Sequence, residues 1–229
     1  MRSSVHPLAG LIAGIARLIS GVQVRWLDVE PDLSQRIYFA NHTSHLDFVV
    51  LWASLPPAVR RRTRPVAAQD YWEKGLRRAL AVNVFNAVLV ARAGHSDGAD
   101  PSHSLASARH TMDHLVESMG SESSLIIFPE GTRGTGEEIA PFKSGLFHLC
   151  QRKPGLALTP VYINNLNRIL PKGEILPVPV ISHLTFGPSL QLQADETKNA
   201  FLTRARDSLC RLRELELDRP RSPETPHET

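Results

Sequence analysis

The segment Asn41–Asp47 (Asn-His-Thr-Ser-His-Leu-Asp) combines a histidine with an aspartate five residues further along the chain. Histidine titrates close to neutral pH, so His42 can act as a general base toward a hydroxyl group. Asp47, hydrogen-bonded to the other ring nitrogen, would fix the tautomer and stabilise the imidazolium. The same spacing also occurs by chance, so a solvated turn in which Asp47 caps the next helix is the open alternative.

A metal site and a protein nucleophile are both less favoured interpretations. His42, His45 and Asp47 do not form a strong zinc spacing, and no third histidine or cysteine lies nearby, so we expect no metal. The chain has no Gly-x-Ser-x-Gly segment, and Cys150 and Cys210 lie in apolar segments with no sign of activation. We therefore expect the substrate to supply the nucleophile, and the two thiols to be packed in a reduced, intracellular protein.

A second polar segment, Pro-Glu-Gly-Thr-Arg at residues 129–133, and two separate cations, Arg92 and Lys143, could bind an anion. Arginine presents a planar fork that suits phosphate, and lysine supplies a point charge. Gly131 would let the backbone approach a ligand closely, and Glu130 would orient the cations or bind a substrate hydroxyl. Each of these residues alone is more often part of a surface ion pair, but together they predict an anionic substrate.

Hydrophobic periodicity indicates which elements carry these residues. Apolar runs predict strands that lead into the polar residues, and apolar spacings of three and four predict helices. The expected strands cover residues 22–26, 37–40, 65–68, 84–91, 125–128, 156–163 and 178–186, and the expected helices cover 48–55, 72–80, 105–119, 142–152 and 201–212. This alternation predicts an α/β fold: a single domain with a mixed, largely parallel sheet flanked by helices. Loops beyond the carboxyl ends of such strands build a crevice, so His42, Arg92 and Glu130 can converge there.

Length and composition favour one compact domain. The chain has 229 residues, of which 42% are hydrophobic and 21% charged, close to an ordinary globular mixture. The formal net charge is +3, and positive charge gathers in residues 60–64 (Arg-Arg-Arg-Thr-Arg), which we expect to form a loop. This cluster faces either phosphate groups or solvent. Because it has little aromatic interleaving, it does not predict a nucleic-acid partner.

The two ends of the chain differ from its centre. Residues 1–24 contain an apolar run from Pro7 to Ile19, which falls short of the roughly 18 uninterrupted apolar residues that a spanning helix needs. We expect an amphipathic or hydrophobic helix here that either packs on the domain or lies in a membrane interface. The main domain would then cover residues 25–217. Residues 218–229 are polar and proline-rich, and we expect them to form a disordered tail.

The two polar segments together resemble the signatures of the glycerophospholipid acyltransferases. Asn41–Asp47 is similar to their His-x4-Asp motif, and Phe128–Arg133 is similar to their Phe-Pro-Glu-Gly-Thr-Arg motif. Three further segments resemble the Phe-Lys-x-Gly segment, the arginine-bearing strand and the proline-containing apolar strand of this family: 142–145, 88–92 and 158–161. The resemblance covers about residues 36–165 and implies an acyltransferase domain within residues 25–217.

The resemblance implies transfer of a fatty acyl group from acyl-CoA or acyl-carrier protein, without a further cofactor, to the free hydroxyl of a lysophospholipid. The acceptor would most often be 1-acyl-glycerol-3-phosphate, giving phosphatidate. By this resemblance His42 is the base and Asp47 its orienting partner, and backbone donors near Gly131 stabilise the oxyanion. The implied glycerol phosphate contacts are Arg92, Glu130, Gly131, Thr132 and Arg133, with Lys143 as a further phosphate contact. The implied location is the cytoplasmic face of the inner membrane, with peripheral or monotopic attachment through the N-terminal helix and the arginine cluster.

Two departures from the family pattern bear on the acceptor. Many members carry an acidic residue where this chain has Ala91, and an aromatic residue where it has His45. Another lysolipid, or glycerol-3-phosphate itself, is therefore the alternative acceptor. A non-catalytic lipid-binding protein of the same fold is the alternative from a different class.

Overall fold

A central strand, β2 (Arg36–Ala40), carries the chain into the histidine-bearing segment and is buried along its whole length. The computed structural model describes residues 7–44, 46–72, 75–91, 101–166 and 181–218. Within them the chain forms a seven-stranded sheet in the order β1-β7-β6-β2-β5-β3-β4. The other strands are β1 (Gln23–Trp26), β3 (Thr63–Ala68), β4 (Val88–Val90), β5 (Ser124–Ile127), β6 (Ala157–Asn164) and β7 (His183–Phe186). Every neighbouring pair is parallel except β6 and β7, so the predicted mixed, largely parallel sheet is confirmed.

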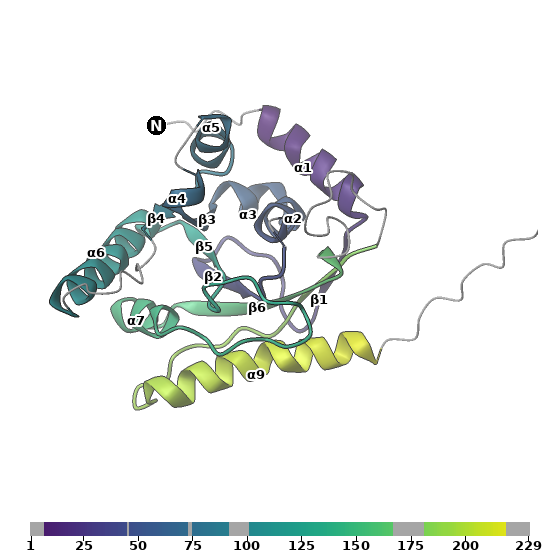
Figure 1. Ribbon diagram of the computed structural model, residues 1–229. Coiled ribbons are helices and arrows are strands. Elements are labelled where there is room, and N and C mark those ends of the chain that lie inside the picture. Colours follow the sequence, from purple (N-terminus) through teal and green to yellow (C-terminus); the bar gives the residue numbers. More distant parts are fainter. Residues whose placement is uncertain (1–6, 45, 73–74, 92–100, 167–180, 219–229) are drawn as a thin grey trace, which may run out of the picture.

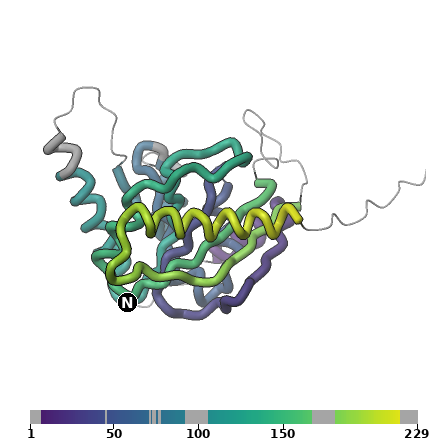
Figure 2. Tube along the Cα trace, turned by 90° about the horizontal axis from the view of Figure 1, so that it is seen from below, coloured from purple at the N-terminus to yellow at the C-terminus, as the bar shows by residue number. Residues whose placement is uncertain are grey.

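Helices cover both faces of this sheet (Figure 1). On one face lie α1 (Pro7–Ser20), α2 (Asp47–Ser54), α3 (Pro57–Arg61), α4 (Gln69–Trp72) and α5 (Gly75–Asn83). The other face packs against α6 (Pro101–Met119), α7 (Gly145–Arg152) and α9 (Lys198–Leu217), and Figure 2 shows α9 running across it. Successive side chains of a strand point to opposite faces, so Tyr38 joins the core beneath α1 and α2, whereas Ile37 and Phe39 join the core against α6, α7 and α9. The predicted α/β class is confirmed.

The register of the sheet brings two distant segments to one edge. β2 pairs with β5 so that Phe39 is opposite Ile127, and with β6 so that Phe39 is opposite Pro160. Because β2 and β5 are parallel, the chain leaves both strands in the same direction. The segment after Ala40 and the segment after Ile127 therefore emerge side by side.

The arginine cluster was wrongly predicted to form a loop. Its first part belongs to α3, which begins at Pro57, and Arg64 lies inside β3. Proline is well tolerated in the first turn of a helix because its missing N–H would be unpaired there in any case. Pro56 and Pro57 therefore mark the beginning of a helix, where the sequence pattern predicted only the end of one.

The apolar run 84–91 is a strand only at Val88–Val90. The backbone N–H groups of Val84 and Phe85 both donate to the carbonyl of Leu80, at 3.0 and 3.1 Å, so the first part of the run completes the end of α5. The ring of Phe85 packs edge-on against Phe48 and Trp52, which explains why this part is apolar. A short apolar run does not distinguish a buried helix end from a buried strand.

Smaller differences concern element boundaries. The helix predicted at 72–80 is two helices, α4 and α5, and α6 begins at Pro101, before the predicted start at residue 105. Of the strand predicted at 178–186, residues 181–186 are described, and His183–Phe186 of these form β7. The tail from residue 219 and the residue Arg92 lie outside the described residues.

The N-terminal helix α1 packs on the domain through one side. Ala13 is buried, and Arg17 Nη2 donates to the carbonyl oxygen of Ser54 at 3.1 Å, which ties α1 to the end of α2. On the other side Leu8, Leu11 and Leu18 are exposed. No helix in the described ranges combines the length and the apolar character needed to cross a membrane.

Candidate active site

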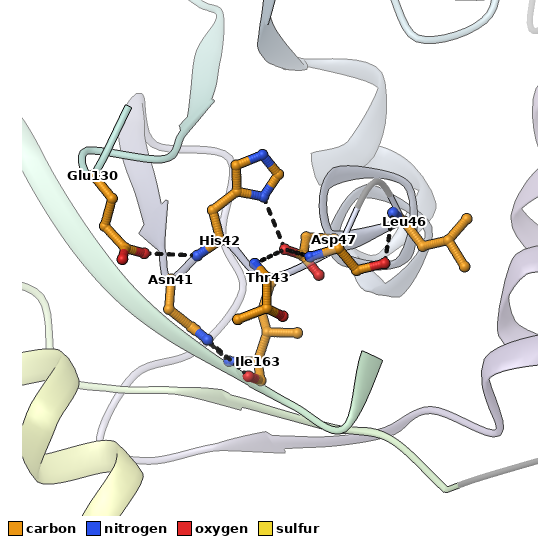
Figure 3. Close-up of polar contacts among 8 residues, drawn as sticks. Asn41, His42, Thr43, Leu46, Asp47, Glu130 and Ile163 are labelled. Atoms are coloured by element: carbon orange, nitrogen blue, oxygen red, sulfur yellow. Dashed lines mark hydrogen bonds and ion pairs between the residues drawn. The ribbon is translucent and has the colours of Figure 1, made fainter. Parts of the chain in front are cut away.

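His42 and Asp47 form a hydrogen-bonded pair at the carboxyl end of β2 (Figure 3). The Nδ1 atom of His42 lies 2.9 Å from Oδ2 of Asp47. The same carboxylate oxygen accepts hydrogen bonds from the backbone N–H groups of Thr43, at 2.6 Å, and Ser44, at 2.8 Å. Asp47 is completely buried at the first position of α2, whereas the His42 side chain is 22% exposed. The aspartate is thus fixed, and the histidine reaches the surface.

The alternative in which Asp47 caps a helix in a solvated turn is wrong. The N-cap residue of α2 is Leu46, and no side chain makes a capping hydrogen bond there. The Asp47 carboxylate turns back toward the preceding loop and the imidazole instead. Its negative charge is nevertheless favoured at this place, because the amino end of a helix carries a partial positive charge.

This arrangement leaves one ring nitrogen of His42 available. An ionised carboxylate accepts hydrogen bonds only, so the proton between the two residues sits on Nδ1. The lone pair is then on Nε2, which has no hydrogen-bond partner among the described residues and points away from Asp47 in Figure 3. Oδ1 of Asp47 is buried and also lacks a partner in this part of the chain. The pair therefore leaves Nε2 of the imidazole without a hydrogen bond in the described ranges, while a buried carboxylate holds Nδ1.

The loop after β5 contacts His42 from the other side. Phe128 stacks on the imidazole, with 4.3 Å between ring centroids and an angle of 22° between the rings. Oε1 of Glu130 accepts the backbone N–H of His42 at 2.8 Å, and Oε2 accepts the backbone N–H of Ala140 at 3.0 Å. The N–H of Gly134 donates to the carbonyl of His42 at 2.8 Å. The loop that carries the second polar segment thus contacts both the ring and the backbone of His42.

The remaining side chains of the second segment, and that of Lys143 beyond it, behave differently. The side chains of Thr132, Arg133 and Lys143 are exposed, and within the described ranges they form no hydrogen bond or ion pair. Gly131 has a φ of +74°, and a Cβ atom there would lie 3.3 Å from Cγ of Lys143, so a larger residue would be strained. Its own N–H donates to the carbonyl of Phe128 at 3.1 Å and is already occupied. Thr132 and Arg133 in this loop, and Lys143 beyond it, therefore present an exposed hydroxyl and two exposed cations.

Asn41 is a site residue to which the sequence alone assigned no role. Its side chain is buried, and its Nδ2 atom donates to the carbonyl of Ile163 at 2.9 Å while Oδ1 accepts the N–H of Ile163 at 2.8 Å. The amide thus copies the hydrogen bonds of a strand residue and extends the contact between β2 and β6. An amide directly after an apolar strand was the only sequence signal for this function.

Other predicted chemistry is not brought to this site by the described residues. Arg92 and His45 lie outside them, and β4 ends at Val90. Among the described ranges, no three His, Cys, Asp or Glu side chains are placed to hold a metal ion. Cys150 is buried in α7, and burial raises the pKa of its thiol to about 12, so it is not an activated nucleophile.

Comparison with known proteins identifies the family of this chain. The family model described as Acyltransferase matches residues 21–164, which include both polar segments and more than half of the chain. The chain belongs to the Acyltransferase family. Two curated relatives of this acyltransferase-family chain are the 1-acyl-sn-glycerol-3-phosphate acyltransferases of Limnanthes douglasii and Limnanthes alba. They are 27% and 26% identical over 189 residues, which is 79% of this chain and 60% of theirs. The chain thus spans about 60% of the length of these relatives.

A solved structure supports the fold of this acyltransferase-family chain. The crystal structure of the 1-acyl-sn-glycerophosphate (LPA) acyltransferase PlsC from Thermotoga maritima superposes with a TM-score of 0.69. The alignment covers 94% of this chain and 81% of that one at 17% sequence identity. At this identity the similarity establishes the architecture, and function has to be argued from the residues of the site.

Proposed function

We propose that the protein transfers a fatty acyl group from a thioester, acyl-CoA or acyl-carrier protein, to the free hydroxyl of 1-acyl-glycerol-3-phosphate, forming phosphatidate. The observation that carries this proposal is the pair of His42 and Asp47, whose Nε2 is unpaired among the described residues, together with the contact of the Arg133-bearing loop with the His42 backbone. The names of the two plant relatives support the acceptor. Membership of the Acyltransferase family supports the reaction class.

In the proposed reaction the nucleophile is the acceptor's own hydroxyl group. Nε2 of His42 takes the hydroxyl proton as the oxygen attacks the thioester carbonyl, and the buried carboxylate of Asp47 stabilises the imidazolium. When the tetrahedral intermediate collapses, the carbon–sulfur bond breaks, and the leaving thiolate receives the proton from His42. The new ester and the free thiol carry all the atoms of the two substrates, and no covalent intermediate on the protein is required.

The acceptor phosphate would bind to the exposed cations Arg133, in the loop after β5, and Lys143, beyond that loop. Arg133 can make a bidentate contact with phosphate, Lys143 adds a point charge, and Thr132 adds a hydroxyl. The resemblance adds Arg92 to this set. None of the first three side chains has to leave another partner among the described residues, so an arriving phosphate meets unpaired donors.

The first experiment measures thiol release by the purified protein with acyl-CoA or acyl-carrier protein and lysophosphatidate. His42→Ala should abolish it, a loss of about 10³-fold or more because the base is removed. His148→Ala, which removes an exposed histidine on α7, is the matched control and should keep full activity. A His42→Ala protein that folds, as judged by circular dichroism, and still releases thiol at the wild-type rate would contradict the mechanism.

The choice of acceptor needs a separate comparison of substrates. Ala91 and His45 depart from the family pattern, so lysophosphatidate should be assayed beside glycerol-3-phosphate and an amine-bearing lysolipid. The proposal requires the highest kcat/KM with lysophosphatidate. A different preferred acceptor would retain the reaction but change the substrate.

Attachment to the cytoplasmic surface of the cell membrane is the second part of the proposal. Leu8, Leu11, Ile15 and Leu18 recur at spacings of three and four on α1, and all are exposed on the side turned away from α2. Such a stripe on a surface helix suits the boundary between head groups and acyl chains. Arg17 on α1 and Arg60 and Arg61 on α3 add positive charge that favours an anionic lipid surface.

Vesicle flotation with anionic lipid tests this attachment. Leu18→Asp changes a leucine of α1 that is 83% exposed, and it should weaken binding strongly. Leu217→Asp is the matched control, because that leucine is 64% exposed but lies at the end of α9. Equal binding by both variants would contradict attachment through α1.

A further inference from the structure

Glu130 is a buried carboxylate whose two oxygens are both occupied by backbone groups. The residue is only 3% exposed. Oε1 accepts the N–H of His42 at 2.8 Å, a contact drawn in Figure 3, and Oε2 accepts the N–H of Ala140 at 3.0 Å. A side chain that binds a substrate hydroxyl has to present an accessible oxygen. Glu130 instead joins the histidine-bearing segment to the far end of its own loop.

The loop of Glu130 also holds the other side of the His42 backbone. The N–H of Gly134 donates to the carbonyl of His42 at 2.8 Å, so the backbone N–H and C=O of His42 are both bound by residues 130–134. A Cβ atom built on Gly134 would lie 3.6 Å from Oε2 of Glu130, so the loop lies close over the carboxylate. Phe128 covers one face of the imidazole at 4.3 Å.

These contacts decide where Nε2 points. Asp47 fixes only the Nδ1 end of the ring, at 2.9 Å. The position of the Cα–Cβ bond, from which the side chain projects, is set by the backbone contacts to Glu130 and Gly134. Displacing a reactive group by about 1 Å can lower a rate by about 10²-fold, so anchoring this end matters for a base.

We propose that Glu130 is a positioning residue that orients His42, and that it does not contact the acceptor. Substrate binding by the Pro-Glu-Gly-Thr-Arg segment then falls to Thr132 and Arg133, whose side chains are exposed and unpaired among the described residues. One short loop thus has two functions: its first half holds the base in place and its second half receives the anion. This inference rests on the proposed role of His42 as the base.

The test compares Glu130→Gln with Arg133→Gln in the full chain. Glutamine keeps the volume of glutamate, but its NH2 group has to face one of the two backbone N–H donors. One of the two hydrogen bonds made by Glu130 is therefore lost. We expect kcat to fall about 10- to 100-fold with the acceptor KM changed less than about threefold. Arg133→Gln should show the opposite pattern: the acceptor KM should rise, and kcat should change less.

An NMR measurement separates this inference from the proposed reaction, because it does not require turnover. The imidazole resonances of His42 should shift or broaden in Glu130→Gln and stay unchanged in Arg133→Gln. Unchanged His42 resonances, together with a raised acceptor KM at constant kcat in Glu130→Gln, would overturn the inference and make Glu130 an acceptor contact. If no thiol is released by the wild-type protein, the proposed function fails, while the His42 resonances still report whether Glu130 orients the imidazole.

A measurement on the wild-type protein covers the case in which Glu130→Gln does not fold. The backbone N–H groups of His42 and Ala140 should exchange slowly with solvent, because both donate to a buried carboxylate. Saturating glycerol-3-phosphate should leave the side-chain carboxyl resonance of Glu130 in place. Rapid exchange of both amides, or a large shift of that resonance on adding the phosphate, would overturn the inference.

Discussion

The two loops that meet at the candidate active site use their polar side chains in opposite ways. In the loop after β2, Asn41 and Asp47 are buried and bonded to the backbone, and the histidine between them is bonded to Asp47. In the loop after β5, Thr132 and Arg133 are exposed and, like Lys143 beyond it, make no hydrogen bond within the described ranges. One loop is already arranged before any ligand arrives, and the other keeps its donors in solvent.

This difference matches the two tasks of a transferase. A base works best when its hydrogen bonds are fixed before the reaction, because reorganisation then adds nothing to the barrier. A cation that binds an anion reversibly gains by staying accessible, since a buried unpaired charge would destabilise the empty protein. Glu130 lies on the loop after β5 but resembles the polar residues of the loop after β2, because it is buried and both of its oxygens accept hydrogen bonds.

The largest of the further effects is expected from Asp47→Asn, which tests the fixed loop. Asparagine can still place an oxygen where the N–H groups of Thr43 and Ser44 and the ring of His42 now donate, so the geometry should be kept. The negative charge that would stabilise the imidazolium in the proposed reaction is lost, and we expect kcat to fall about 10²- to 10⁴-fold. Steady-state kinetics should show little change in the acceptor KM.

A surface aspartate provides the control for that variant. Asp113 on α6 forms an exposed ion pair with Arg152, and Asp113→Asn removes a charge without touching either loop. Its kcat should equal that of the wild type. If Asp47→Asn retained kcat within about threefold, the buried charge would have no catalytic role and the contrast between the loops would be one of stability alone.

A smaller effect, on binding, is expected from Arg133→Gln and Arg133→Lys. The side chain has no partner among the described residues, so both variants should change the free energy of unfolding by less than about 0.5 kcal/mol, as urea titration would show. The acceptor KM should rise about tenfold for glutamine and less for lysine, which keeps the charge but loses the planar fork. A loss of stability, or an effect on kcat alone, would show that Arg133 is held by other residues of the protein, as Asn41 and Asp47 are.

How far the sequence predicted this molecule depends on the range of the interactions involved. The strands β2, β5 and β6 were predicted correctly, because a buried parallel strand reads as a continuous apolar run. The run beginning at Val84 is also apolar but completes a helix, as the backbone hydrogen bonds to Leu80 and the packing of Phe85 on Trp52 show. Local pattern identifies burial, whereas tertiary contacts decide between helix and strand.

The same division applies to the site. His42 and Asp47 are five residues apart, so their pairing could be predicted from spacing. The contact of Glu130 with the His42 backbone joins residues 88 positions apart, and that of Asn41 with Ile163 joins residues 122 apart. These contacts follow from the parallel register of β2 with β5 and β6, which the sequence does not specify residue by residue. The pairing of His42 with Asp47 was therefore predictable, and the long-range contacts that hold His42 in place were not.

The smallest effect is expected from Lys143→Met, which tests whether the exposed group extends beyond the Pro-Glu-Gly-Thr-Arg segment. The backbone N–H of Lys143 donates to the carbonyl of Pro129 at 2.8 Å, and its side chain passes beside Gly131, so it reaches the same solvent region as the second loop. Methionine keeps the length of the apolar stem and removes the charge. Because water and dissolved ions screen an exposed charge, we expect the acceptor KM to rise only about two- to fivefold.

Salt dependence makes this last prediction specific. If Lys143 attracts the acceptor phosphate, the KM of the wild type should rise with ionic strength, and that slope should be smaller in Lys143→Met. Lys198→Met, which removes an exposed lysine at the start of α9, should keep the wild-type slope. Equal slopes for all three proteins would limit the anion-binding group to the loop itself, and the contrast between fixed and exposed donors would then lie between residues 41–47 and 130–133 alone.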